Sequence, residues 1–268
     1  SRAVVLNAED VYCVQMADTL ADTVDIIYFA LDAEDPTLLR HVEHGGRAVY
    51  LQDAMIVMAS GVRREALLDV REMPVSLGGR ARYNIANAMA AAAALTASGF
   101  GNAEIADGLR GFVSDSKHNP LRSNLFDVDG VTVVVDYAHN CAAYAALADM
   151  ARSMTPGRLV GVVAAPGDRR DADLIDIGRT CAAGFDELVV YETENRGRAD
   201  GETATLLARG AKLGKIGNES LQLELDVHRA IRLGLSMCRP GDVMVFGCGS
   251  SISELTEALR PTRPDLAR

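Results

Sequence analysis

The sequence predicts an α/β protein whose second half forms a mostly parallel sheet with helices on both faces. Short, almost entirely apolar runs alternate with helical patterns through that half, as expected of strands that are buried on both faces. Aromatic residues make up only 5% of the chain, Trp is absent and alanine runs are common, which disfavours an all-β sandwich. With 268 residues the chain is long enough for two compact domains.

The first half of the chain is predicted to mix strands and helices. Its expected strands are residues 3–6, 26–30, 47–51 and 55–58, the last two forming a hairpin. Its expected helices are residues 10–21, 34–43, 83–98 and 103–112. Gly45 follows the second of these helices, where a glycine C′ residue is favoured. The alanine run in the third helix allows it to pack closely against a sheet.

Residues 114–124 are the best linker candidate. This stretch, SDSKHNPLRSN, is polar and contains a proline, and the pattern of the chain changes after it. We therefore expect a first domain over residues 1–118 and a second over residues 119–268.

The second half alternates strands with helices and predicts a Rossmann-like sheet. Its expected strands are residues 131–135, 159–164, 187–191, 221–225 and 243–247. Its expected helices are residues 142–154, 172–184, 202–213, 227–238 and 251–260. Ligands of such sheets bind beyond the carboxyl ends of the strands. The loops of interest are therefore residues 136–141, 165–171, 192–198 and 247–251.

The run DYAHN at residues 136–140 directly follows a predicted buried strand. Asp136 would direct a carboxylate into the ligand crevice, where it can accept from ribose hydroxyls or orient a cation. His139 and Asn140 add a titratable donor and an amide at the start of the next helix, where phosphate is favoured. The alternative is a helix cap with a surface histidine.

Two further loops at this predicted edge are basic, although the protein is acidic. Asp168, Arg169 and Arg170 follow one strand, and Arg196 and Arg198 follow the next. Adjacent arginines can hold a phosphate or a substrate carboxylate through charge-assisted hydrogen bonds. Solvated turns with self-paired charges are the alternative.

Other polar positions also allow both a functional and a structural interpretation. Asn84 and Asn87 lie on one face at the start of the alanine-rich helix, where their amides could contact an adenine edge or simply cap the helix. The glycine-containing run 247–251 lacks a third glycine and a following βαβ unit, which excludes a dinucleotide fingerprint. His41 and His44 have no evident third ligand, so no metal site is predicted.

The bulk composition disfavours several partners. The formal net charge of −10 disfavours DNA and anionic membranes, so neither nucleic acid nor membrane is expected as a partner. Five widely spaced cysteines without a C-x-x-C indicate reduced thiols in a cytoplasmic protein. Neither a signal peptide nor an apolar run of 18 residues is found. The sequence leaves a homo-oligomer open.

The start of the chain and one missing motif point to a larger protein. Ser1 stands in place of an initiator Met, and an apolar run begins at Ala3. No G-x-x-x-x-G-K-[ST] occurs, so the chain has no P-loop. We expect a piece of a longer protein.

Taken together, these features resemble the second half of a Mur ligase. Residues 82–93, RYNIANAMAAAA, resemble the asparagine-containing helix of that family, and DYAHN resembles a signature of its C-terminal domain. Arg122 stands where the family has an arginine between two domains. The resemblance implies that residues 1–118 are the truncated end of a central α/β ATPase domain. Residues 119–268 would then be the Rossmann-like C-terminal domain.

The resemblance also implies a nucleotide site for ATP and Mg²⁺, with the Mg²⁺ ligands largely in the missing part. In the family the later asparagine of the helix contacts adenine, and the arginine between the domains reaches the nucleotide phosphates. The nucleotide-binding residues implied here are Asn84, Asn87, Arg122, Asp136, His139 and Asn140. Among them, Asp136 and His139 are the catalytic candidates.

The implied activity is ATP-dependent amide bond formation. ATP phosphorylates a carboxylate, and an amine attacks the resulting acyl phosphate. Residues 77–95, 119–140, 166–171 and 196–202 resemble a subgroup that attaches arginine to the aspartate side chains of a polymer. ATP, an amino acid and a polymer are thus the expected partners. The residues expected to face the amino acid or polymer are Asp168, Arg169, Arg170, Arg196 and Arg198.

Alternatives remain open within this interpretation. The chain departs from the family pattern at Cys141, where proline is common, and at Leu121, where glycine is common. It could therefore belong to another Mur-like amino-acid ligase of the peptidoglycan or folylpolyglutamate type, or be a noncatalytic nucleotide-binding domain. We expect the 268-residue chain to be inactive alone.

Overall fold

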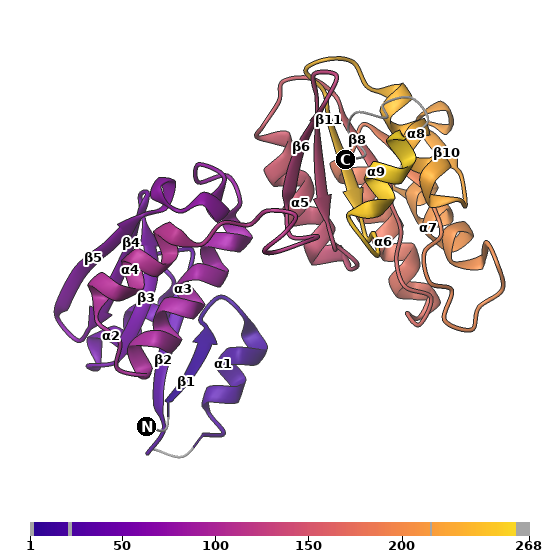
Figure 1. The fold of residues 1–268 in the computed structure, drawn as a ribbon. Coiled ribbons are helices and arrows are strands. Elements are labelled where there is room, and N and C mark those ends of the chain that lie inside the picture. Colours follow the sequence, from indigo (N-terminus) through magenta and orange to yellow (C-terminus); the bar gives the residue numbers. More distant parts are fainter. Residues whose placement is uncertain (1–2, 21–22, 215, 261–268) are drawn as a thin grey trace. The chain divides into compact units, whose positions relative to one another are not determined.

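The computed structural model describes residues 3–20, 23–214 and 216–260. The chain divides into two compact units, Ser1–Val113 and Ser114–Arg268 (Figure 1). The polar segment 114–124 groups with the second unit.

The first unit is built on a five-stranded sheet in the order β1-β2-β3-β4-β5 (Figure 1). Its strands are β1 (Ala3–Asn7), β2 (Asp25–Ala30), β3 (Arg47–Gln52), β4 (Met55–Ser60) and β5 (Arg63–Asp69). Its helices are α1 (Val11–Ala17), α2 (Pro36–Glu43), α3 (Arg82–Ala97) and α4 (Asn102–Gly111). The first three strands are parallel, and β3, β4 and β5 form an antiparallel meander. The four strands and four helices expected from the sequence are all found.

The alanine-rich helix α3 packs on this sheet as expected. Its buried residues are Ile85, Ala88, Met89, Ala92 and Ala93. They share one hydrophobic cluster with apolar residues of β2, β3, β4 and β5. Small side chains at this interface leave room for the helix to approach the strands closely.

The edge strand β5 was not expected from the sequence. Its first three residues, Arg63, Arg64 and Glu65, are charged, and its pairing with β4 is interrupted between Ile56 and Val57. Charged residues and bulges are typical of edge strands, where they discourage pairing with another chain. Because of these features β5 does not show the alternation of apolar and polar residues by which a strand is recognised in a sequence.

The second unit is built on a six-stranded sheet in the order β10-β9-β8-β11-β7-β6 (Figure 1). Its strands are β6 (Asn124–Val128), β7 (Val131–Asp136), β8 (Leu159–Val163), β9 (Glu187–Val190), β10 (Leu221–Leu223) and β11 (Val243–Gly247). Its helices are α5 (Cys141–Arg152), α6 (Asp171–Gly184), α7 (Glu202–Leu213), α8 (Val227–Met237) and α9 (Ser253–Leu259). All neighbouring strands are parallel except β6 and β7. The predicted mostly parallel α/β sheet is confirmed.

The strand order assigns the helices to the two faces of the sheet. The chain moves from β7 through β8 and β9 to β10 in one direction, then returns to β11. Because parallel crossovers are right-handed, the helices of the outward path cover one face and α8 of the return path covers the other. α5, α6 and α7 accordingly contact one another in sequence, whereas α8 pairs with α9. In sheets with such a reversal ligands bind beyond the carboxyl ends of the strands, so the ends of β8, β11 and β7 are where a ligand is expected.

The strand β6 was also missed, although the sequence carries a signal for it. β6 and β7 form a hairpin whose turn residues, Asp129 and Gly130, have φ angles of 53° and 81°. A two-residue Asp-Gly turn with both φ angles positive is favoured in tight hairpins. The linker prediction ended within β6, so the turn was not recognised.

No helix within the described ranges is long and apolar enough to cross a membrane.

Candidate functional site

Four loops meet at the carboxyl edge of the second sheet. They follow β7, β8, β9 and β11, which are neighbours in the order β9-β8-β11-β7. The loops singled out from the sequence are therefore adjacent in space, as expected for parallel strands. Two buried tyrosines stabilise this edge: the Tyr144 hydroxyl donates to Ala164 O at 2.7 Å, and the Tyr191 hydroxyl donates to Gly247 O at 2.9 Å.

Asp136 is the last residue of β7 and is half-buried. Its Oδ2 accepts hydrogen bonds from the Ser123 backbone N–H at 2.9 Å and from the Ser123 hydroxyl at 3.0 Å. Burial raises the pKa of this carboxyl above its ordinary value, against the opposing effects of the Ser123 hydrogen bonds and the Arg122 charge. A carboxylate held in this way is poised to interact with a polar or cationic ligand group.

Arg122 lies beside Asp136 on the segment that precedes β6. Its guanidinium carbon is 5.9 Å from the centre of the Tyr137 ring, within the range of a cation–π interaction. The side chain is otherwise exposed. The backbone is fixed nearby, because the Tyr137 N–H donates to Leu121 O at 2.9 Å. An exposed cation and a half-buried carboxylate thus share one end of β7.

His139 and Asn140 have different roles in the structure. The His139 Nδ1 is 2.9 Å from Tyr137 O. Since a carbonyl oxygen only accepts, Nδ1 carries the proton and Nε2 of the neutral ring is an acceptor. Asn140 caps α5 by accepting from the Ala143 N–H at 2.9 Å, which is the capping alternative considered for this residue.

The two basic loops are interlocked. The Gly167 N–H donates to Glu194 O at 3.0 Å, and a Cβ on Gly167 would lie 1.9 Å from Asn195 O. Only glycine fits this close approach. Across the same contact, Arg196 donates to Asp168 at 2.7 Å, which lowers the pKa of the Asp168 carboxyl.

Arg198 joins three segments of the chain. Its guanidinium donates to Gly167 O, Arg169 O, Asp171 and Glu202, each at 2.7 Å, and its side chain is only 16% exposed. These contacts fix the two loops and the starts of α6 and α7. The sequence had suggested substrate binding for Arg198; its donors are directed at the protein itself, and the substrate role stays a prediction.

The remaining two arginines differ from each other. Arg170 makes a two-point ion pair with Asp173, at 2.7 and 2.8 Å, on the exposed surface. The Nε of Arg169 is buried and has no hydrogen-bond partner in the described part of the chain. A buried donor without an acceptor is unfavourable, so Arg169 is well suited to receive an anionic ligand group.

Asn84 and Asn87 belong to the first unit, near the start of α3. The Asn84 amide donates to Val75 O at 2.9 Å and is half-buried. Asn87 is exposed and makes no side-chain hydrogen bond with the described residues. Of the two, Asn87 has the amide that is available to a ligand.

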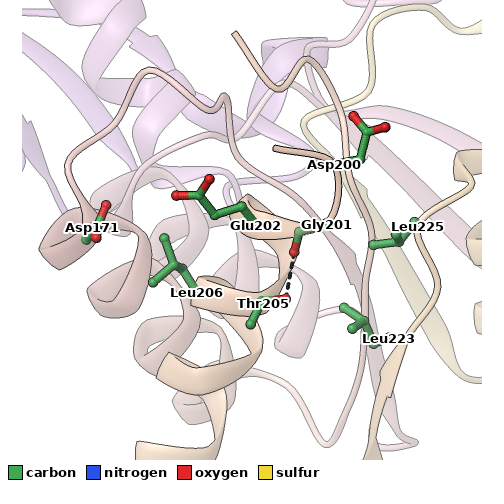
Figure 2. A pocket seen from close by; sticks show the side chains of 8 residues that line it. All are labelled: Asp171, Asp200, Gly201, Glu202, Thr205, Leu206, Leu223 and Leu225. Atoms are coloured by element: carbon green, nitrogen blue, oxygen red, sulfur yellow. Dashed lines mark hydrogen bonds between the residues drawn. The ribbon is translucent and has the colours of Figure 1, made fainter. Parts of the chain in front are cut away.

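A hollow of about 370 Å³ lies next to the interlocked loops (Figure 2). It is lined by Asp171, Asp200, Gly201, Glu202, Thr205, Leu206, Leu223 and Leu225. Its three carboxylates already have partners in the protein: Arg198 pairs with Asp171 and Glu202, and Asn195 donates to Asp200 at 2.9 Å. Among the described residues no group of three or more His, Cys, Asp or Glu side chains could hold a metal ion.

Ser123 is a site residue that sequence reasoning missed. It is 3% exposed and contacts Asp136 across 13 positions of sequence. No local pattern distinguishes it from other serines, because its role depends on the pairing of β6 with β7.

The fold and these loops define a doubly wound α/β domain, a class in which ligands bind at the carboxyl edge of the sheet. Residues 121–250 match the sequence model described as "Mur ligase, glutamate ligase domain". Most of the second unit thus matches the model of a Mur ligase domain, and the resemblance seen in the sequence is confirmed for this unit.

Among curated proteins, the chain is similar to cyanophycin synthetases. It is 33% identical to that of Synechocystis sp. (strain ATCC 27184 / PCC 6803 / Kazusa), over 97% of this chain and 29% of the relative. It is also 33% identical to that of Nostoc sp. (strain PCC 7120 / SAG 25.82 / UTEX 2576), over 96% of this chain and 28% of the relative. The chain thus spans less than a third of the length of these relatives.

Several solved structures of ligases share the fold. A pseudomurein peptide ligase type C from Methanothermus fervidus aligns with a TM-score of 0.64 at 16% identity, over 97% of this chain and 57% of its own. A bifunctional folylpolyglutamate synthase/dihydrofolate synthase from Yersinia pestis c092, complexed with AMPPNP and Mn ion, aligns with a TM-score of 0.56 at 19% identity. That alignment covers 88% of this chain and 53% of the synthase.

Proposed function

We propose that this chain is part of an ATP-dependent carboxylate–amine ligase and contributes one side of its nucleotide site. In this proposal residues 1–118 are the end of the central ATPase domain and residues 119–268 are the C-terminal domain. The observation that carries the proposal is the grouping of Arg122, Asp136 and His139 at the carboxyl end of β7. This grouping lies in the unit that matches the Mur ligase domain.

The finer proposal is a ligase of the cyanophycin synthetase type, which adds arginine to the aspartate side chains of a poly-aspartate backbone. Its support is the similarity to cyanophycin synthetases over nearly the whole chain. ATP, arginine and the polymer are the proposed substrates.

The chemistry needs positioning and charge neutralisation more than a protein nucleophile. ATP phosphorylates the acceptor carboxylate, the amine attacks the acyl phosphate, and the tetrahedral intermediate expels phosphate. In this scheme Arg122 offers its exposed guanidinium to phosphate oxygens. Asp136 accepts from a ribose hydroxyl, and His139 presents Nε2 as an acceptor. The exposed amide of Asn87, with Asn84 beside it, is proposed to contact adenine.

The loops after β8 and β9 are proposed to face the amino acid or polymer. Arg169 is the best placed of their arginines, because its buried Nε lacks a partner among the described residues. The ion pairs of Asp168 with Arg196, and the contacts of Arg198, hold this loop in place. Arg170 lies at the exposed start of α6 and is proposed to contact the polymer.

A divalent cation, proposed to be Mg²⁺, fits the described residues poorly. They contain no cluster of ligands for it, and Asp136 alone could contribute one carboxylate. The Mn ion in the related synthase supports a cation in this class of enzyme. We propose that most of its ligands lie outside this chain.

The test uses the complete ligase that contains this chain, assayed with ATP, arginine and an aspartate polymer. We expect Asp136→Asn and Arg122→Ala each to lower kcat/KM for ATP by at least about tenfold, because each removes a charge facing the nucleotide. Exposed Arg260 in the same unit is the matched control, and Arg260→Ala should leave the rate unchanged. Activity only with a muropeptide or folate acceptor would indicate another Mur-like ligase. Full activity of Asp136→Ala would favour a noncatalytic nucleotide-binding domain.

A further inference from the structure

The segment expected to be a linker, residues 114–124, is held in one conformation by a series of side-chain hydrogen bonds between its own residues. The Ser114 hydroxyl donates to Arg122 O at 2.7 Å, and the Asn119 amide donates to Ser114 Oγ at 3.0 Å. The Asn124 amide donates to Asn119 O at 3.1 Å and its oxygen accepts from the Leu121 N–H at 2.7 Å. Arg122 therefore lies on an ordered loop with defined geometry.

Both neighbours of Arg122 have left-handed backbone conformations. The φ angle is 60° at Leu121 and 53° at Ser123, although neither residue is glycine. Such conformations are unfavourable for residues with a side chain and persist when the surrounding contacts stabilise them. The contacts around Leu121 and Ser123 must therefore offset the unfavourable free energy of these two backbone conformations.

Those contacts lead to the end of β7. Leu121, which precedes Arg122, accepts a hydrogen bond from the Tyr137 N–H through its carbonyl oxygen. Ser123, which follows Arg122, donates two hydrogen bonds to Asp136 Oδ2. Arg122 is thus fixed from both sides to Asp136 and Tyr137. Its guanidinium lies over the Tyr137 ring as a result.

The hydrogen bonds of Ser123 are directed at a charged group of the site. The side chain is almost completely buried, and its hydroxyl and N–H converge on one carboxylate oxygen. Two donors on one oxygen restrict the rotation of the Asp136 carboxyl group. They also favour its charged form.

We propose that Ser123 is a positioning residue for the nucleotide: it orients the Asp136 carboxylate and the Arg122 guanidinium so that together they receive a nucleoside triphosphate. This inference rests on the proposed function, because it assigns Asp136 and Arg122 to the nucleotide. Ser123 acts through these two residues and does not itself contact the ligand.

The experiment compares Ser123→Ala with the unchanged complete ligase. Loss of the hydroxyl leaves the backbone N–H bond in place, so we expect folding to be retained and the site to be loosened. A hydrogen bond to a charged group is worth enough to change affinity about tenfold, so KM for ATP should rise by about that factor. We expect kcat to change less than about twofold, because Ser123 takes no part in bond formation.

Two further variants separate the hydroxyl from other effects. Ser123→Gly also lacks the hydroxyl but adopts the left-handed backbone easily, so it should show the same rise in KM without added strain. Ser236→Ala is the matched control, since Ser236 is exposed on α8 and its hydroxyl bonds only to Leu233 O in the described structure. We expect its KM and kcat to be unchanged.

A spectroscopic measurement tests the orientation directly. In the 268-residue chain, an NMR titration of Asp136 should give a higher pKa in Ser123→Ala than in the unchanged protein, because the lost hydrogen bond favoured the carboxylate. An unchanged pKa would overturn the positioning role.

The kinetic outcomes distinguish this inference from the proposed function. If Ser123→Ala and Ser123→Gly keep the KM for ATP while Asp136→Asn and Arg122→Ala raise it, the inference is wrong and the nucleotide site stands. If none of the four variants changes the KM, the nucleotide site is wrong, and the role of Ser123 falls with it. A fall in kcat at constant KM would also overturn the inference.

Discussion

The charged side chains on the two sides of the carboxyl edge of the second sheet differ in how completely they are paired within the protein. In the interlocked loops after β8 and β9, Asp168, Arg196 and Arg198 pair with groups of the protein itself. At the end of β7, Asp136 is half-buried with a raised pKa, and Arg122 extends over an aromatic ring into solvent. Charges that are satisfied within the protein maintain its architecture, whereas charges that are only partly satisfied can still respond to a ligand. Arg169 lies in the interlocked loops, but like the residues at the end of β7 it has a polar group that the described part of the protein leaves unsatisfied.

The interlocked loops should be the more sensitive to a change of shape. Gly167→Ala places a Cβ 1.9 Å from Asn195 O, and a backbone atom cannot move aside without separating the loops. We expect the second unit to lose about 3 kcal/mol or more of unfolding free energy, measured by urea denaturation. Gly217→Ala is the control, because that glycine has ordinary φ and its nearest contact would be 3.7 Å. Equal stability of the two variants would contradict a rigid interlock.

The end of β7 should be the more sensitive to pH. Because burial raises the folded-state pKa of Asp136 above the ordinary value near 3.8, its protonated form is favoured by folding. Its contribution to stability is therefore fully present below the ordinary aspartate pKa and is lost as pH rises through the folded-state pKa.

The difference in unfolding free energy between the unchanged protein and Asp136→Asn isolates this contribution. Urea denaturation from pH 3 to pH 7 should show the unchanged protein losing stability relative to Asp136→Asn as pH rises. If the unchanged protein instead gains stability relative to Asp136→Asn as pH rises, the effects of hydrogen bonding and of Arg122 on the pKa outweigh that of burial at this carboxyl.

The smallest effect is expected at Leu121, where the family commonly has glycine. Leu121 has φ of 60° and packs against the core of the second unit. Leu121→Gly relieves the left-handed strain but removes apolar contacts, two effects of about 1 kcal/mol each and of opposite sign. We expect the unfolding free energy to change by less than about 1 kcal/mol. Leu121→Ala loses the contacts without relief of strain and should be clearly less stable than Leu121→Gly.

Much of the fold followed from the sequence because local pattern determines it. The apolar runs of the second half gave the parallel sheet, and the sheet in turn gave the loops of the site. The missed strands have physical reasons: charged residues obscure β5, and β6 lies next to a polar segment whose proline suggested a linker. The domain boundary proposed at 118/119 stays a prediction.

The site was only partly predictable for a different reason. Sequence identifies an arginine but not its partners, and the contact between Arg198 and Gly167 joins residues 31 positions apart. The distinction between Arg198, whose donors are occupied, and Arg169, whose Nε is not, arises only in the folded chain. The same holds for Ser123 and Asp136.

The interlock of Gly167 with Asn195 also has a consequence for folding. These residues follow β8 and β9, which are paired in parallel with Val163 opposite Val190. A slip of one residue between the strands would turn the side chains of one strand to the opposite face and move Gly167 away from Asn195. The loops can therefore close only on correctly paired strands, and the interlock is compatible with the native strand register alone.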